Sequence, residues 1–158
     1  KTIALFLVVV MLTTTMGSTV LAGTENQGFS DQAETTVDSR FLDGIDTAGY
    51  DYVITSQEQA DELRVSDDSK SILVACGSVY LSGITAGTIT IRNTTKIQLS
   101  NVTAKALDIS QGTAISFTGV KADQLLIAGE KTEESSLQID SETNISKLEL
   151  NGGQAVTL

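Results

Sequence analysis

The chain of 158 residues contains no histidine, no proline and no tryptophan, and it has a single cysteine. Without histidine, a Cys–His catalytic pair cannot form within this sequence. The lone Cys76 has no second cysteine with which to make an internal disulfide bond. It follows the apolar run Ile72–Ala75, so we expect it to be a small, buried hydrophobic residue.

Aromatic residues are also scarce, at 4% of the chain. A compact globular core usually relies on aromatic side chains for bulk. This chain must fill its interior with isoleucine, leucine, valine and alanine, which suit stacked short strands. Apart from its N-terminal leader, the sequence has room for one modest domain.

Basic residues are half as frequent as acidic ones, 10 against 20, and the net charge is −10. The imbalance is concentrated in residues 23–70, where twelve Asp and Glu residues stand against only Arg40, Arg64 and Lys70. A chain this acidic, without a basic stripe, is a poor candidate for binding nucleic acid or an anionic lipid surface. We therefore expect no nucleic-acid partner, and no membrane contact once the leader is removed.

Residues 1–22 have the pattern of a secretory signal peptide. Lys1 precedes the apolar run Ile3–Leu12, and a small-residue exit ends at Ala22. We predict cleavage after Ala22 and a mature protein that is secreted or displayed on the cell surface. An uncleaved membrane anchor is the alternative, because Thr2–Gly23 carries no charge. Since the chain begins with lysine instead of methionine, we expect the natural protein to start further upstream.

Residues 23–48 are polar and acidic, with a periodicity of neither 2 nor 3.6 residues. This composition predicts a flexible linker. Residues 49–70 then predict an N-terminal cap, which includes a short strand over Tyr50–Ile54. A cap covers the open end of a stacked sheet, which would otherwise recruit other chains.

The cap is also expected to contain a short helix over Gln57–Arg64 and a turn at Asp67–Ser69. Ser56 and Gln59 match a capping box, with Ser56 as the N-cap residue. Ala60 and Leu63 follow at helical spacing.

Residues 71–158 repeat with a period of about 18 residues. When the turns are aligned, six columns of apolar residues appear, namely Val79/Ile97/Ile115/Leu137/Val156, Leu81/Leu99/Phe117/Ile139/Leu158, Ile84/Val102/Val120, Ala86/Ala104/Ala122, Ile89/Leu107/Leu125/Leu148 and Ile91/Ile109/Ile127/Leu150. Alternate residues face inward in a strand, so the pattern predicts three short strands per turn. Like residues then stack over like, about 4.8 Å apart.

The corners of the predicted coil agree with this register. Gly83, Asn101 and Gly119 recur every 18 residues between the first two strands, and these residue types tolerate positive φ. Strand pairs begin at positions 79, 84, 89 and 97, so two corners are sharp and one is longer. That spacing favours a right-handed helix over a left-handed hexapeptide helix. The extra residues of the third turn, 129–136, fall at the long corner.

The predicted fold is therefore an all-β, single-stranded, right-handed parallel β-helix with an N-terminal strand and short-helix cap. From about Tyr50 to Leu158 the chain resembles secreted bacterial parallel β-helix proteins of the pectin-lyase-like class. In that class a capping helix precedes coils that carry isoleucine, valine and leucine ladders. The resemblance is architectural, without a diagnostic catalytic motif. It implies either polysaccharide cleavage or a surface and adhesive role.

Any catalytic side chains would lie among the outward-facing residues, which in the first strand of each turn are Tyr80, Gln98, Ser116 and Gln138. Polysaccharide hydrolases on this fold need clustered carboxylates, and lyases need a calcium site of several acidic residues plus a basic residue. Asp108 and Glu149 share an outward column two turns apart, roughly 9–10 Å by stacking, with Leu126 between them. No third carboxylate joins that column, so we interpret both as surface acids and predict no catalytic residue.

Two further patterns have ordinary explanations. An acidic set in the cap lacks the ligand spacing of an EF-hand loop and is interpreted as a solvated face; its members are Asp61, Glu62, Asp67 and Asp68. Asn-X-Thr/Ser tripeptides are frequent by chance in a threonine-rich chain, and here they begin at Asn93, Asn101 and Asn144. We predict no cofactor and no metal ligand.

The leading functional hypothesis is a non-catalytic, secreted or surface-displayed β-solenoid, acting as a stalk, an adhesive or a carbohydrate-contacting module. Its partner would be an extracellular polysaccharide or a host or cell-surface protein. The alternative is the N-terminal part of a polysaccharide lyase or glycoside hydrolase of the parallel β-helix class. Because Val156–Leu158 opens a fifth turn, we expect the natural protein to continue beyond Leu158.

Overall fold

The computed structural model describes residues 38–129 and 136–151. The predicted signal peptide, residues 23–37 of the predicted linker and the predicted start of a fifth turn lie outside these ranges. The described elements are η1 (Ser39–Phe41), β1 (Tyr52–Ile54), α1 (Gln57–Glu62), β2 (Ser66–Ala75), β3 (Ser78–Ser82), β4 (Thr85–Arg92), β5 (Lys96–Ser100), β6 (Thr103–Ser110), β7 (Ala114–Thr118), β8 (Lys121–Ala128), β9 (Ser136–Ile139) and β10 (Asn144–Asn151).

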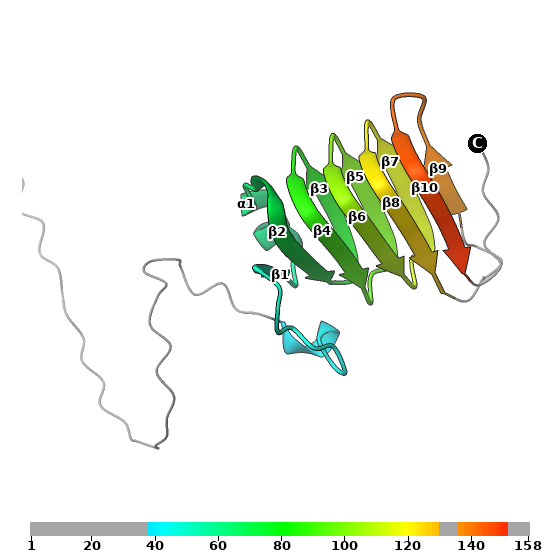
Figure 1. Cartoon of the computed structure of the whole chain (residues 1–158). Helices are drawn as coiled ribbons and strands as arrows, with labels where there is room; N and C mark the ends of the chain where they lie inside the picture. Colours follow the sequence, from blue (N-terminus) through cyan, green and yellow to red (C-terminus); the bar gives the residue numbers. More distant parts are fainter. Residues whose placement is uncertain (1–37, 130–135, 152–158) are drawn as a thin grey trace, which may run out of the picture. The chain divides into compact units, whose positions relative to one another are not determined.

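The strands form two parallel sheets that are wound into one coil, which confirms the predicted β-solenoid. One sheet has six strands in the order β1-β2-β4-β6-β8-β10, and the other has four in the order β3-β5-β7-β9. Paired residues in β3, β5 and β7 are 18 residues apart along the chain, as in Ser78, Lys96 and Ala114. In Figure 1 the chain rises behind through β9, crosses over and descends in front through β10, which makes the coil right-handed.

Each turn contains two strands, where three had been predicted. The predicted second and third strands are one continuous strand, for example β4. Hydrogen-bonded pairing lapses only at the bend, between Ala86↔Ala104 and Thr88↔Ala106. No described residue at this bend has a positive φ, whereas the two other corners are built on such residues. The chain therefore bends there without breaking the sheet.

The interior consists of the predicted columns up to the last described rung, where Leu148, predicted to face inward, is 41% exposed and Ile139 and Leu150 are only partly buried. The members of the columns stack in register through the backbone pairing, as in Val79↔Ile97↔Ile115↔Leu137. The largest fully buried side chain is Phe117, which replaces a leucine in its column. Cys76 is buried too, as predicted, and burial raises the pKa of its thiol.

Two corners of the coil rest on residues with positive φ. The predicted corner between the sheets is confirmed, with φ of 67° at Gly83, 52° at Asn101 and 61° at Gly119. The opposite corner repeats the device with φ of 50° at Asn93 and 69° at Gln111. A positive φ strains residues other than glycine, and asparagine is among those that tolerate it best.

The fourth turn departs from the regular spacing. Phe117 pairs with Ile139 across 22 residues, whereas Lys121 pairs with Asn144 across 23, so the intervening corner holds one extra residue. In earlier turns a backbone carbonyl accepts the corner N–H, as when Asn101 donates to Thr118. Here Gly119 N–H donates to the Asp140 carboxylate at 3.1 and 3.2 Å.

Thr143 completes this corner. Its hydroxyl donates to Asp140 Oδ1 at 2.6 Å and accepts from Val120 N–H at 3.2 Å. The hydroxyl bond from Thr143, followed by bonds from backbone N–H groups, holds the pKa of Asp140 below its ordinary value. Side chains thus supply the contacts that the lengthened corner removes from the backbone.

The N-terminal cap contains the predicted strand and helix. Ser56 is the N-cap residue of α1, and its hydroxyl accepts from Gln59 N–H at 3.3 Å. Gln59 reaches back to Thr55 N–H at 2.6 Å, one residue before the partner in a standard capping box. The helix ends at Glu62, two residues earlier than predicted, because Leu63 is already extended.

The turn predicted at Asp67–Ser69 lies inside a strand. β2 continues through it with a register shift between Asp67 and Ser71, which is the mark of a β-bulge. The bulge has a local turn of its own, since Asp67 Oδ1 accepts from Ser69 N–H at 2.9 Å. This bond, together with one from the Ser69 hydroxyl at 2.7 Å, lowers the pKa of Asp67.

Residues 38–48, the last part of the predicted linker, contact the coil. Asp38 N–H donates to Thr55 Oγ1, and the Asn93 amide donates to Phe41 O, each at 2.9 Å. The Phe41 ring lies 3.8 Å from the position that a Cβ on Gly77 would occupy. This stretch is therefore part of the folded body.

Asp140 gives the fold a testable dependence on pH. We expect Asp140→Asn to lower the unfolding midpoint at neutral pH, because the carboxylate accepts bonds that depend on its charge. Its folded-state pKa is depressed, so its stabilisation is complete above about pH 4 and is lost as the pH falls through the folded value. Urea unfolding of both proteins between about pH 7 and about pH 2 should show midpoints that converge toward acid.

Glu142→Gln is the matched control, since Glu142 is an exposed acid in the same corner. It removes the same charge while leaving the Gly119 and Thr143 bonds to Asp140 in place. Parallel pH profiles for the two variants would contradict the role of Asp140.

Candidate functional site

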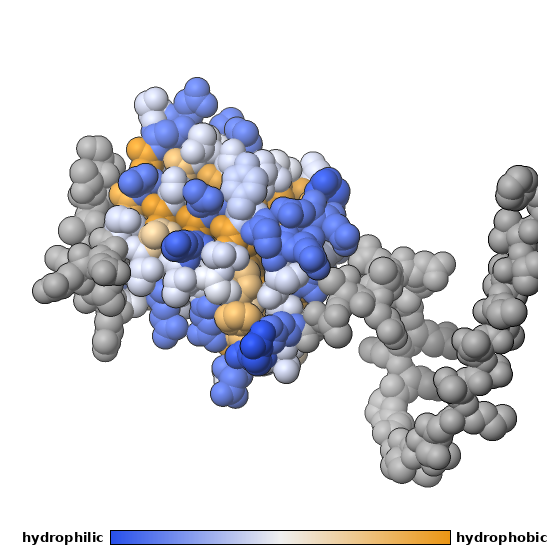
Figure 2. All heavy atoms as spheres, turned by 180° about the vertical axis from the view of Figure 1, so that it is seen from behind, coloured by the Kyte–Doolittle hydropathy of each residue, from blue (hydrophilic) through white to orange (hydrophobic). Residues whose placement is uncertain are grey.

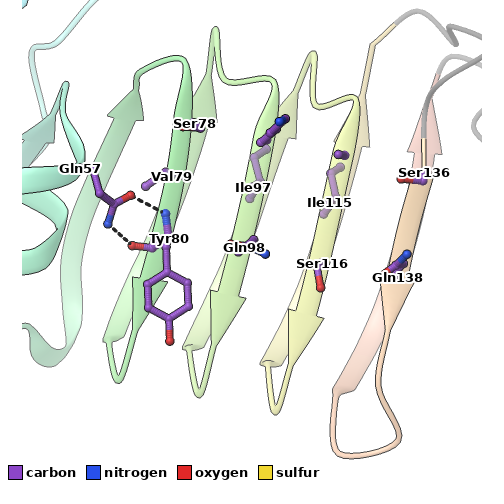
Figure 3. Close-up of a pocket in the computed structure, with 12 residues that line it drawn as sticks. Gln57, Ser78, Val79, Tyr80, Ile97, Gln98, Ile115, Ser116, Ser136 and Gln138 are labelled. Carbon is purple, nitrogen blue, oxygen red and sulfur yellow. Dashed lines mark hydrogen bonds between the residues drawn. The ribbon is translucent and has the colours of Figure 1, made fainter.

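The outer face of the four-stranded sheet carries a groove of about 370 Å³. Two rows of outward side chains border it, Ser78/Lys96/Ala114/Ser136 and Tyr80/Gln98/Ser116/Gln138, and each row runs across β3, β5, β7 and β9. Figure 3 shows Tyr80, Gln98, Ser116 and Gln138 side by side on successive strands. The groove therefore runs along the axis of the coil, across the strands.

The floor between the rows is the strand backbone at Val79, Ile97 and Ile115, whose side chains are buried in the core. In Figure 2, which shows this face of the molecule, apolar residues appear as an orange band between paler and bluer polar ones. Since the side chains of Val79, Ile97 and Ile115 point inward, the groove has a floor of strand backbone between polar borders.

Tyr80 is the one aromatic side chain among the described residues that line the groove, and it is 45% exposed. The side-chain amide of Gln57, the first residue of α1, bonds to both the N–H and the C=O of its backbone. Gln57 Oε1 accepts from Tyr80 N–H at 2.7 Å, and Gln57 Nε2 donates to Tyr80 O at 2.9 Å. Both bonds are drawn in Figure 3. The cap helix therefore holds the backbone segment from which this exposed ring projects.

The borders of the groove are mostly uncharged. Of the twelve described residues that line it, Lys96 alone carries a charge. The others that can bond to a ligand offer serine hydroxyls, glutamine amides and the Tyr80 hydroxyl, which both donate and accept hydrogen bonds. Such a surface is suited to a ligand that presents many hydroxyl or amide groups.

A second groove, of about 410 Å³, crosses the outer face of the six-stranded sheet beside the bend. It follows the stacked column Ala86/Ala104/Ala122, which lies at the bend of the sheet. Its lining is charged, with Asp68, Lys105, Lys121 and Asp123. Lys105 and Asp68 form an exposed ion pair at 3.0 Å.

The two outward carboxylates singled out in the sequence do share a column, with Leu126 between them. Asp108 accepts a two-pronged contact from Arg92, at 2.6 and 3.1 Å. Glu149 lies 3.6 Å from Lys147 Nζ. Each carboxylate is therefore next to a basic side chain on the same face.

The acidic residues of the cap point to separate partners. Asp61 accepts from the Gln57 amide at 2.7 Å, Asp67 bonds within its own bulge, and Asp68 pairs with Lys105. In residues 38–129 and 136–151 no three potential metal ligands come together. Within the same residues, no helix has the length and hydrophobicity needed to cross a membrane.

Asp51 is the most strongly perturbed acid of the described residues. Ser71 N–H donates to it at 2.8 Å, and Lys70 lies 3.1 Å away. These contacts, the backbone bond first, lower the pKa of Asp51 to about 2. They join the start of β1 to β2 and are structural.

The asparagines of the three tripeptides have different surroundings. Asn93 donates to Phe41 O, and Asn101 serves as a corner residue with positive φ. Asn144 begins β10, where its N–H donates to Val120 O. Two of the three thus have structural tasks.

The sequence identified one border of the groove as an outward column but did not identify the groove. The signal was present in the alternation itself, since residues 78 and 80 flank an inward residue on each rung. What the sequence could not show is the Gln57 contact, which joins residues 23 apart without any periodic pattern.

Gln57→Ala is expected to lower the free energy of unfolding by about 1–2 kcal/mol, because two hydrogen bonds to β3 are lost. Gln57→Glu should be no more stable than the alanine variant, since a carboxylate cannot donate to Tyr80 O. Urea unfolding checks both. Glu58→Ala, at the next and exposed helix position, is the control, and equal losses at positions 57 and 58 would contradict the prediction.

Comparison with protein families, with curated proteins and with solved structures finds no match to this chain.

Proposed function

We propose that the chain is a non-catalytic module of a secreted or surface-displayed protein and that it contacts carbohydrate through the groove on its four-stranded sheet. The observation that carries the proposal is the exposed Tyr80, whose backbone is held by the cap helix, at one end of rows of hydroxyl and amide side chains. Aromatic rings with a polar edge, placed on rigid elements, are favoured in recognition surfaces.

Three features support a binding module. The groove is open and elongated, which suits a chain-like ligand. Its borders lie on strands, which place side chains more exactly than loops do. The surface as a whole is acidic, at −10 for the chain, which disfavours nucleic acid as the ligand.

The alternative function is the N-terminal part of a polysaccharide lyase or glycoside hydrolase. Asp108 and Glu149 do not favour it, because Arg92 and Lys147 lie against them and Leu126 separates them. Export belongs to the proposal as well, and it rests on the signal-peptide pattern of residues 1–22. So does kinship with the pectin-lyase-like class, which rests on the coil architecture and the cap.

Tyr80→Ala should weaken binding to the polysaccharides that the parent protein retains in affinity electrophoresis. The expected loss is about 0.5–1.5 kcal/mol, or roughly 2- to 10-fold in affinity, which is typical of a single aromatic contact. Tyr52→Ala is the matched control, since Tyr52 is similarly exposed at 36% but lies on β1, outside the groove. Equal retention of parent and Tyr80→Ala on every polysaccharide that binds would sink the assignment of the groove.

A further inference from the structure

We propose that the groove takes an uncharged glycan, lying along the axis of the coil, in preference to an acidic one. This inference rests on the proposed function and names the ligand class of the same site. It follows from the chemistry of the two groove borders, from the spacing of the strands and from the charge of the rest of the protein.

The first step is the charge of the lining. An acidic polysaccharide carries a negative group on every repeat, so a dedicated site needs a cation on successive rungs. The row that contains Lys96 offers Ser78, Ala114 and Ser136 on the other three rungs. The row that contains Tyr80 offers only uncharged side chains. One ammonium group in four rungs cannot match a repeating anion.

The second step is the field around the groove. With twenty acidic and ten basic residues, the chain repels polyanions at long range. Asp140 directly follows β9, two residues after Gln138 of the groove border, and its carboxylate accepts bonds from the Thr143 hydroxyl and from Gly119 N–H. The net charge of the chain therefore acts against an acidic ligand, and the single Lys96 of the groove opposes this effect at one rung only.

The third step is geometry. Strand neighbours are about 4.8 Å apart, so the row from Tyr80 to Gln138 extends about 14 Å along the coil axis. Gln98 and Gln138 are two rungs apart with Ser116 between them. Each amide provides two donors and an acceptor pair to hydroxyl or acetamido groups on a sugar chain. An extended chain stacked on Tyr80 at one end can thus meet both amides.

The second groove gives the contrast. Its lining includes the charged residues Lys105, Lys121, Asp68 and Asp123. The groove on the four-stranded sheet has one charged lining residue, Lys96. Variants in the second groove serve as controls for nonspecific charge effects on binding.

The experiment measures the affinity of the full chain for three hexasaccharides by calorimetry. The probes are β-1,4-linked glucose, β-1,4-linked N-acetylglucosamine and α-1,4-linked galacturonate. We expect at least one uncharged probe to bind about 10-fold more tightly than galacturonate. That binding should change little between about 0.05 and about 0.5 M salt, because no ion pair is screened.

The double variant Gln98→Ala/Gln138→Ala should weaken uncharged binding by about 10-fold or more, through the loss of two amide contacts. Gln124→Ala is the matched control, since Gln124 is exposed on β8 of the other sheet. Lys96→Ala should have a small effect, similar to that of Lys121→Ala.

Each other outcome is decisive. Tighter, salt-sensitive galacturonate binding that needs Lys96 would overturn the preference for uncharged glycans while leaving the proposed carbohydrate role intact. Uncharged binding that survives both the glutamine double variant and Tyr80→Ala would remove the ligand from this groove. Absence of binding to all three probes and to the polysaccharides of the Tyr80 experiment would overturn the proposed function itself.

Discussion

In-register pairing between successive turns is the constraint on which the rest of this structure depends. Each rung bonds to the next through parallel backbone pairs, so a residue is always stacked on its equivalent one turn away. A slip by one position would turn every inward side chain outward. The columns of isoleucine, leucine and valine therefore define the register, and the corners with positive φ hold each rung to the same path.

The same register arranges the surface. Because outward residues also stack, a strand pattern such as that of β3 becomes a row of side chains along the coil when it repeats in β5, β7 and β9. Two such rows on either side of an inward position make a groove. On the other sheet, the second groove follows the stacked alanine column at the bend. Both grooves are thus consequences of the repeat and not of separate loops.

Much of the fold could be predicted from the sequence because periodicity reveals stacking. The inward columns, the Gly83/Asn101/Gly119 corner, the burial of Cys76 and the Ser56 cap all follow from residue type and spacing. The bend near residue 87 was wrongly interpreted as a strand break, because two successive outward residues look the same in sequence whether or not the backbone pairing resumes beyond them.

Contacts without a period could not be predicted. Asp140 replaces a backbone carbonyl only because its corner is one residue longer, and that length becomes visible when the register of β8 and β10 is known. The candidate groove could not be predicted from the sequence for a similar reason. Its polar row is periodic and was recognised as outward, but its hollow depends on the position of side chains on four strands.

The cap is best understood as part of the groove. β3 begins the four-stranded sheet, so its outer edge needs a partner that no further strand supplies within the described residues. Gln57 provides one, since an amide side chain carries the same donor and acceptor as a peptide group and bonds to both the N–H and the C=O of Tyr80. One interaction therefore both satisfies the edge and holds the backbone of the residue that carries the ring. A change in α1 that releases Gln57 must loosen the residue on which the proposed recognition depends.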